Sequence, residues 1–166
     1  PWTVHRSLGA LLWGVAAALA VCGVSLATVT VRARRGVLTD HHVSVKEHRR
    51  PVMLGTFALV AVFLAVNLAF HGPVEVTGLL MATLAASAVV ALVSPFWKIS
   101  VNGMMMGGTA VILPTAVGPW GLLFLPVAVA VCVSRRVLRA HTWAQLFAGF
   151  GFGIVVLGGI YALIAG

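Results

Sequence analysis

The residues best suited to chemistry lie in SRRVLRAHTWAQ, Ser134 to Gln145, between two apolar runs. Arg135 stands six positions before His141. A guanidinium binds phosphate oxygens bidentately, and an imidazole nitrogen attacks phosphorus to form a phosphohistidine. The pair therefore predicts phosphoryl transfer at the edge of an apolar run. A histidine at such an edge has a second interpretation, as an interfacial side chain with an apolar body and a polar tip, and the segment alone leaves both open.

A second polar cluster opens another apolar run, in WKISVNGMMMGG, Trp97 to Gly108. It holds Lys98, Ser100 and Asn102, although such a run normally begins with nothing more polar than a helix cap. Whether this cluster serves the same chemistry depends on the elements that position the two segments.

Composition predicts that these elements are membrane helices. The chain has 166 residues, is 61% hydrophobic and 8% charged, and has a mean hydropathy of +1.09. A soluble domain of this length has too little interior to bury that much apolar surface. We expect six spans, at about residues 8–31, 52–70, 76–93, 100–117, 122–133 and 143–165. Glycines in the fourth and sixth spans favour close backbone packing, so the predicted fold is an all-α bundle of six transmembrane helices, with residues 1–166 as a single domain.

Nearly all the charge falls on connections that alternate to one face of the membrane. The formal net charge is +8, from 11 Lys and Arg against 3 acids. The cations on this face are Arg32, Arg34, Arg35, Lys46, Arg49, Arg50, Lys98, Arg135, Arg136 and Arg139. The positive-inside rule explains such a bias without any function, and an anion site built from three loops explains it as well. Only the second interpretation accounts for the other polar residues on this face, Asp40, His41, His42, His48 and His141.

The polar segments resemble the signatures of the type-2 phosphatidic acid phosphatase family in order, spacing and placement on one face. The third signature is Ser-Arg, five residues, His, three residues, Asp. Ser134, Arg135 and His141 match it at the family's spacing. Gln145 takes the place of the aspartate.

The first and second signatures match in part. The second is Pro-Ser-Gly-His at the start of a membrane helix, and here Ser100 matches the serine while Asn102 takes the place of the histidine. The first is Lys, six residues, Arg-Pro. Arg50 and the proline after it match, but the lysine position is Val43, and Lys46 lies three residues later.

The resemblance covers the chain from the first span onward. It implies a six-helix fold and metal-independent hydrolysis of lipid-linked phosphate monoesters or diphosphates, with His141 as the nucleophile. The residues that would hold the phosphate are Arg50, Arg135, Ser100, Lys98, Arg139 and, as a substitute for the absent lysine, Lys46. Asp40 and His41 resemble a variant, actinobacterial-like branch with a degenerate first signature.

Two departures weaken the catalytic part of this prediction. The family's histidine at position 102 protonates the leaving group, and the amide of Asn102 supplies no proton near neutral pH. Gln145 accepts a hydrogen bond and fixes the tautomer of His141, but does not stabilise an imidazolium as a carboxylate does. Three explanations of Asn102 stay open: an engineered substitution in an otherwise intact site, a natural degenerate member, or another histidine (His41 or His48) as the acid.

The predicted partners are the lipid bilayer and a lipid-linked phosphate, either an isoprenoid (poly)phosphate or a phospholipid monoester. We expect no nucleic-acid partner, because the basic residues lie in the loops of a membrane protein. No cofactor or metal is predicted, since the histidine pair at 41–42 lacks further ligands at suitable spacing. The oligomeric state is left open.

Two rival functions come from other classes. A bundle that grips phosphate without catalysis is supported by Asn102 and Gln145. A small transporter or channel is disfavoured, because no charged residue lies within a span. We expect a bacterial-type plasma membrane. The charge bias favours the cytoplasmic face for the site, but phosphate-binding residues inflate that bias, so sidedness stays open.

Overall fold

A computed structural model of the chain describes Leu12, Val15 and residues 49–166, with side chains from Leu54 onward among the latter. Contacts divide the chain into two compact units, Pro1–Val76 and Thr77–Gly166, each of which is described by itself. The predicted span at 8–31 and four candidate site residues fall outside the described residues, apart from Leu12 and Val15. Those four residues are Asp40, His41, Lys46 and His48.

The first unit holds the helix α2, Arg49–Ala69, and the turn that follows it. The Gly72 amide donates to the Asn67 carbonyl over 2.7 Å, and the His71 amide donates to the Leu68 carbonyl over 3.2 Å. His71 sits at φ 51°, the left-handed conformation that reverses a chain after a helix. The Asn67 side chain is buried and donates to the Pro73 carbonyl over 3.5 Å. These bonds form the short turn that the sequence predicts between its second and third spans.

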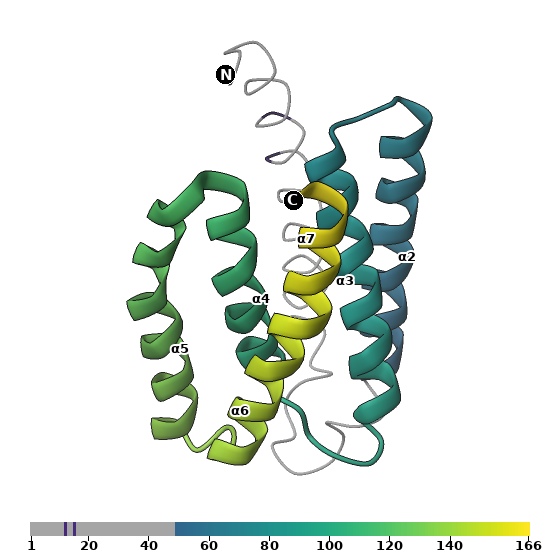
Figure 1. Cartoon of the computed structure of the whole chain (residues 1–166). Coiled ribbons are helices and arrows are strands. Elements are labelled where there is room, and N and C mark those ends of the chain that lie inside the picture. Colours follow the sequence, from purple (N-terminus) through teal and green to yellow (C-terminus); the bar gives the residue numbers. More distant parts are fainter. Residues whose placement is uncertain (1–11, 13–14, 16–48) are drawn as a thin grey trace. The chain divides into compact units, whose positions relative to one another are not determined.

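Helices make up the rest of the described chain, and no strand occurs within residues 49–166. Their order is α3 Val74–Val93, α4 Val101–Val117, η1 Gly118–Phe124, α5 Leu125–Val137, α6 Trp143–Phe152, η2 Gly153–Gly158 and α7 Gly159–Ala165. The segment η1 is a 3₁₀ helix and η2 a π-helix, and α6, η2 and α7 follow one another without a break (Figure 1).

Three helical stretches in the described part are long and apolar enough to cross a membrane: Val74–Val93, Val101–Val137 and Trp143–Ala165. The second, at 37 residues, folds back on itself at η1, so α4 and α5 run antiparallel (Figure 1). The reversal uses Gly118 at φ 74°. It also brings Gly121 so close to the backbone of Leu113 and Pro114 that a side chain there would collide with it. The all-helical class is therefore confirmed for the described residues, and these three apolar helices suggest a membrane-embedded protein, whereas the full set of six spans stays a prediction.

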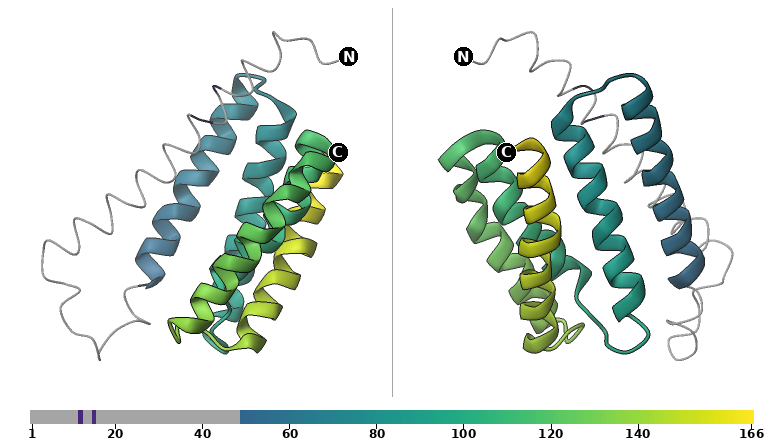
Figure 2. Two further views of the ribbon diagram at one scale, coloured as in Figure 1. Left: turned by 90° about the vertical axis from the view of Figure 1, so that its left-hand side faces the viewer. Right: turned by 45° about the vertical axis from the view of Figure 1, so that its right-hand side comes forward.

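Helix α4 packs backbone to backbone, in parallel, against α6 and η2. A methyl group on Gly103 would lie 2.8 Å from the carbonyl oxygen of Leu146. One on Gly153 would collide with the carbonyl oxygen of Met104. Similarly close neighbours surround Gly107, Gly108, Gly149 and Gly158. This seam confirms the close packing predicted from the glycines of the two spans, and both views in Figure 2 keep α4 beside the helix formed by α6, η2 and α7.

The helix widens at η2, in the middle of this seam. A π turn closes i→i+5 hydrogen bonds and so inserts one extra residue into the helix. The buried face then continues through Leu157 and Gly158 to Tyr161 in α7. A methyl on Gly78 of α3 would lie 3.4 Å from the Tyr161 ring. Thus α7 contacts α3 as well as α4, while α6 and η2 pack on α4.

Candidate functional site

The arginine-rich segment begins on the last turn of α5. The sequence placed Arg135 and Arg136 in the connection after a span ending at residue 133, but the helix continues to Val137. Two basic residues suit this position because the C-terminal end of a helix carries a partial negative charge. Arg135 is half-buried, and its Nε atom is buried without a hydrogen-bond partner among the described residues.

The chain leaves α5 through a Schellman-type ending. The Ala140 amide donates to the Arg135 carbonyl over 3.1 Å, and the Arg139 amide donates to the Arg136 carbonyl over 3.0 Å. Arg139 occupies the left-handed position at φ 52°, where glycine is usual. The exposed Arg139 side chain and the position of His141, two residues later, are therefore set by hydrogen bonds of the backbone.

Helix α6 begins with a capping box that also engages His141. The Gln145 amide donates to the Thr142 hydroxyl over 3.3 Å, and the Thr142 amide donates to Gln145 Oε1 over 3.1 Å. The same Oε1 lies 3.3 Å from His141 Nδ1. The hydrogen bond predicted between His141 and Gln145 is thereby confirmed.

This geometry defines the tautomer of His141. The Thr142 amide requires an acceptor, so the atom of Gln145 that faces it is the amide oxygen. An amide oxygen only accepts, and therefore His141 Nδ1 carries the proton and donates. In the neutral ring, the lone pair then resides on Nε2. That lone pair lies on the side of the ring opposite Gln145.

Ser100 joins the start of α4 to the start of α6. It is the N-cap of α4, with its hydroxyl accepting from the Gly103 amide over 3.1 Å, and its exposed fraction is 0%. Its own amide donates to the Gln145 carbonyl over 3.4 Å. The Ser100 carbonyl is so close to Gly149 that a methyl there would collide with it. The positive ends of two parallel helices therefore lie side by side.

Lys98 bonds to the loop that precedes His141. Its Nζ donates to the Ala140 carbonyl over 3.2 Å, across 42 positions of sequence. Asn102 is the second residue of α4, half-buried, and its side chain makes no hydrogen bond to the described residues. Together these contacts place the two polar segments at one end of the second unit.

All the formally charged side chains of the second unit are positive. Between Thr77 and Gly166 the sequence has no Asp or Glu, and its four cations are Lys98, Arg135, Arg136 and Arg139. Within the described residues, no group of three or more His, Cys, Asp or Glu side chains is placed to hold a metal ion. Such a site attracts an anion and offers it donors from side chains and helix ends.

The structure thus brings together Lys98, Ser100, His141 and Gln145 through hydrogen bonds. Arg135 lies nearby on the last turn of α5, and Arg139 lies in the loop that follows it. Arg50 lies on α2 in the other unit, and its side chain is outside the described part. Thr142 and the Ala140 carbonyl are not among the predicted site residues. The spacing Thr-x-x-Gln before an apolar run is the signal of a capping box, so Thr142 was identifiable, whereas the role of a carbonyl was not.

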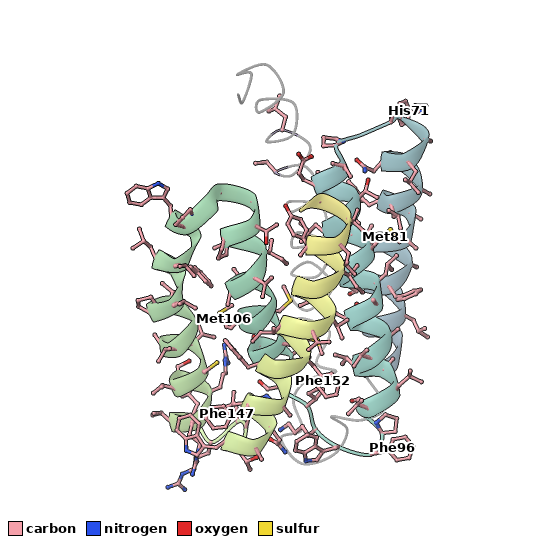
Figure 3. All side chains as sticks on the ribbon, viewed as in Figure 1. His71, Met81, Phe96, Met106, Phe147 and Phe152 are labelled. Carbon is pink, nitrogen blue, oxygen red and sulfur yellow. The ribbon has the colours of Figure 1, made fainter. Side chains whose placement is uncertain are left out.

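Aromatic side chains border this end of the second unit. Figure 3 labels Phe96 in the connection between α3 and α4, and Phe147 near the start of α6. Phe96 is 91% exposed, and Phe147 stacks on Trp143 with a centroid separation of 5.7 Å. Exposed aromatic rings beside basic residues are typical of the membrane–water interface.

In comparisons with protein-family models, with curated proteins and with solved structures, no match to the chain was found.

Proposed function

We propose that this chain is a six-span integral-membrane lipid phosphatase, with His141 as its nucleophile. Its substrate would be an isoprenoid (poly)phosphate or a phospholipid phosphomonoester. The lipid tail would lie in the bilayer, and the phosphate would lie at the paired starts of α4 and α6. We further propose a bacterial-type plasma membrane as its location, with the site on the basic face.

One observation carries this proposal: His141, whose Nδ1 bonds to Gln145, lies where two helix N-termini converge, in a region without acids. The Ser100 amide and the Gln145 carbonyl join these termini over 3.4 Å. The buried Arg135 Nε has no acceptor among the described residues, and buried donors normally have one. A phosphate oxygen would supply that acceptor.

The chemistry follows from the tautomer. Nε2 of His141 would attack phosphorus, and the bond from phosphorus to the lipid oxygen would break as the new N–P bond forms. The ring would become positively charged, since Nδ1 keeps its proton. Water would then cleave the N–P bond, releasing phosphate and restoring the neutral ring. The cations around the site would stabilise the negative charge of the transferring group.

The departing lipid oxygen needs a proton, and Asn102 does not supply one. General-acid help is worth about a hundred- to ten-thousandfold in rate, so we expect slow turnover by the chain as it stands. This deficit favours a second candidate function, in which the protein binds a lipid phosphate without cleaving it. The half-buried Asn102, with no hydrogen bond among the described residues, favours that candidate.

Phosphate release from lipid mono- and diphosphates distinguishes the two candidates. The parent chain, Asn102→His, and Asn102→His combined with His141→Ala are purified in detergent micelles and assayed together. A phosphatase site predicts release that rises about a hundredfold or more in Asn102→His and disappears when His141 is also replaced. If Asn102→His remains inert on every substrate while the parent binds lipid phosphate, the binding function replaces the enzymatic one.

A further inference from the structure

The segment that carries Lys98 is held rigidly on both sides. The Ile99 amide donates to the Trp97 carbonyl over 2.9 Å, which closes a three-residue γ-turn centred on Lys98. Ile99 and Ser100 are both buried, and Ser100 caps α4. The base of the Lys98 side chain therefore has little freedom, although the side chain itself is exposed.

Two hydrogen bonds hold Ala140, the residue before His141. The Ala140 amide donates to the Arg135 carbonyl over 3.1 Å, and the Ala140 carbonyl accepts from Lys98 Nζ over 3.2 Å. This lysine bond links the α3–α4 connection to the loop that precedes His141. A charged donor makes a stronger hydrogen bond to a carbonyl than a neutral donor does.

We propose that Lys98 is a positioning residue, which orients His141 by holding the Ala140 carbonyl. The sequence suggested instead that Lys98 grips phosphate directly. The benefit of orienting His141 rests on the proposed function, but the effect of Lys98 on the loop does not depend on catalysis. If the loop shifts, the distance from His141 Nδ1 to Gln145 Oε1 changes, and with it the preference for the Nδ1–H tautomer.

The tautomer is measurable by NMR. The full chain is labelled with ¹⁵N in its histidine rings, purified in detergent micelles, and studied where the rings are neutral. The chain has 6 histidines, and the spectrum of His141→Gln identifies the signals of His141 by their loss. The Nδ1 and Nε2 shifts then report which nitrogen carries the proton.

We expect Lys98→Met to lower the ratio of Nδ1–H to Nε2–H tautomers of His141 by roughly two- to tenfold, the range that one hydrogen bond supports. Lys98→Arg, which keeps a charged donor, should restore the parent ratio. Arg136→Met is the matched control, because it removes one exposed cation from the same end and makes no such bond. If Lys98→Met does not fold, Lys98→Leu, which also lacks a donor, replaces it.

An unchanged tautomer ratio in the folded lysine variants overturns the inference, and so does an equal change in Arg136→Met. Binding of inorganic phosphate, measured in parallel, separates the two roles of Lys98. A positioning residue predicts an affinity within about twofold of the parent. A loss of tenfold or more without a change of tautomer assigns Lys98 to the phosphate instead. If the parent binds no phosphate, the proposed function fails, while the tautomer ratios still decide the role of Lys98.

Discussion

At the scale of single residues, Gln145 shows how one side chain serves both a fold and a site. Its Oε1 accepts from the Thr142 amide, which stabilises the start of α6, and from His141 Nδ1, which selects the tautomer. A carboxylate would accept both bonds equally well, and Glu is common at this position of a capping box. The amide therefore supports the fold fully and the chemistry only in part, because it carries no charge.

Gln145→Glu should accelerate phosphate release in the Asn102→His background. The added charge would stabilise the cationic ring formed when Nε2 bonds to phosphorus. A hydrogen bond to a charged group exceeds a neutral one by about 1–1.5 kcal/mol, which corresponds to a roughly five- to tenfold gain in rate. Gln145→Leu, which has no acceptor, should lose activity in the same assay. Equal rates in Glu and Leu variants would contradict a role for this position in charge stabilisation.

Arg139 is a second residue where local conformation and function oppose each other. Its left-handed backbone at φ 52° costs a non-glycine residue about 1–2 kcal/mol. Glycine avoids this cost, but its greater conformational entropy stabilises the unfolded state and so offsets part of the gain. Arg139→Gly should therefore raise the free energy of unfolding by about 0.5–1 kcal/mol. If Arg139 holds phosphate, the same variant should bind inorganic phosphate more weakly.

Arg136→Gly is the control for this prediction. Arg136 lies on the last turn of α5, so glycine there should lower the free energy of unfolding by about 1 kcal/mol. Denaturant titrations in micelles, followed by helical circular dichroism, measure both variants. A loss of stability in Arg139→Gly equal to that in Arg136→Gly would show that the left-handed conformation is not strained.

At the scale of elements, the seam between α4 and the α6–η2 helix sets the distance between the two helix starts that form the site. Gly153→Ala should lower the free energy of unfolding by about 1–3 kcal/mol, because the new methyl would meet the Met104 carbonyl and a backbone atom cannot rotate away. Gly151→Ala is the matched control, since a methyl there meets nothing within 4 Å. It should leave stability unchanged or raise it by up to about 1 kcal/mol through helix propensity.

The same pair tests whether the seam supports the site. Widening it by Gly153→Ala should weaken the binding of inorganic phosphate, because the starts of α4 and α6 move apart. Gly151→Ala should bind phosphate as the parent does. If both variants are equally stable and bind equally well, the tight approach of α4 to η2 does not exist in the membrane.

At the scale of the whole molecule, the apolar spans were the easiest feature to predict. The described helical stretch Trp143–Ala165 matches its predicted span at both ends. Thr142 caps its first turn, and apolar residues continue to its last turn. The end of α5 was predicted four residues early, because hydropathy falls at Arg135 while the helix continues through it. Hydropathy marks the apolar part of a helix, whereas hydrogen bonds and caps decide where it ends.

Features that depend on tertiary contacts could not be predicted from the sequence. The π-helix η2 depends on how its glycines meet α4, and no local pattern at 153–158 distinguishes it from an α-helix. The bond from His141 to Gln145 was predictable because both residues lie within one turn. The bond from Lys98 to Ala140 joins two loops, and its acceptor is a backbone carbonyl that every residue possesses.

Labelling of introduced cysteines tests whether α4 crosses the membrane. The 17 residues of α4 rise about 26 Å, close to the thickness of the hydrocarbon core. Exposed residues beyond its two ends should therefore face opposite aqueous phases. Phe96 precedes α4 and Trp120 follows it, with exposed fractions of 91% and 77%. Leu138, on the loop after α5, is 67% exposed and should share the side of Phe96.

The test uses a background in which both native cysteines, Cys22 and Cys132, are replaced by alanine. In sealed vesicles of one orientation, an impermeant maleimide should label Phe96→Cys and Leu138→Cys from one side and Trp120→Cys only from the other. Equal labelling of all three from one side would contradict a hairpin of α4 and α5 across the bilayer. The side that labels Leu138→Cys also decides whether the basic end, and with it the proposed phosphate site, faces the cytoplasm, because Leu138 lies next to Arg139 and three residues before His141.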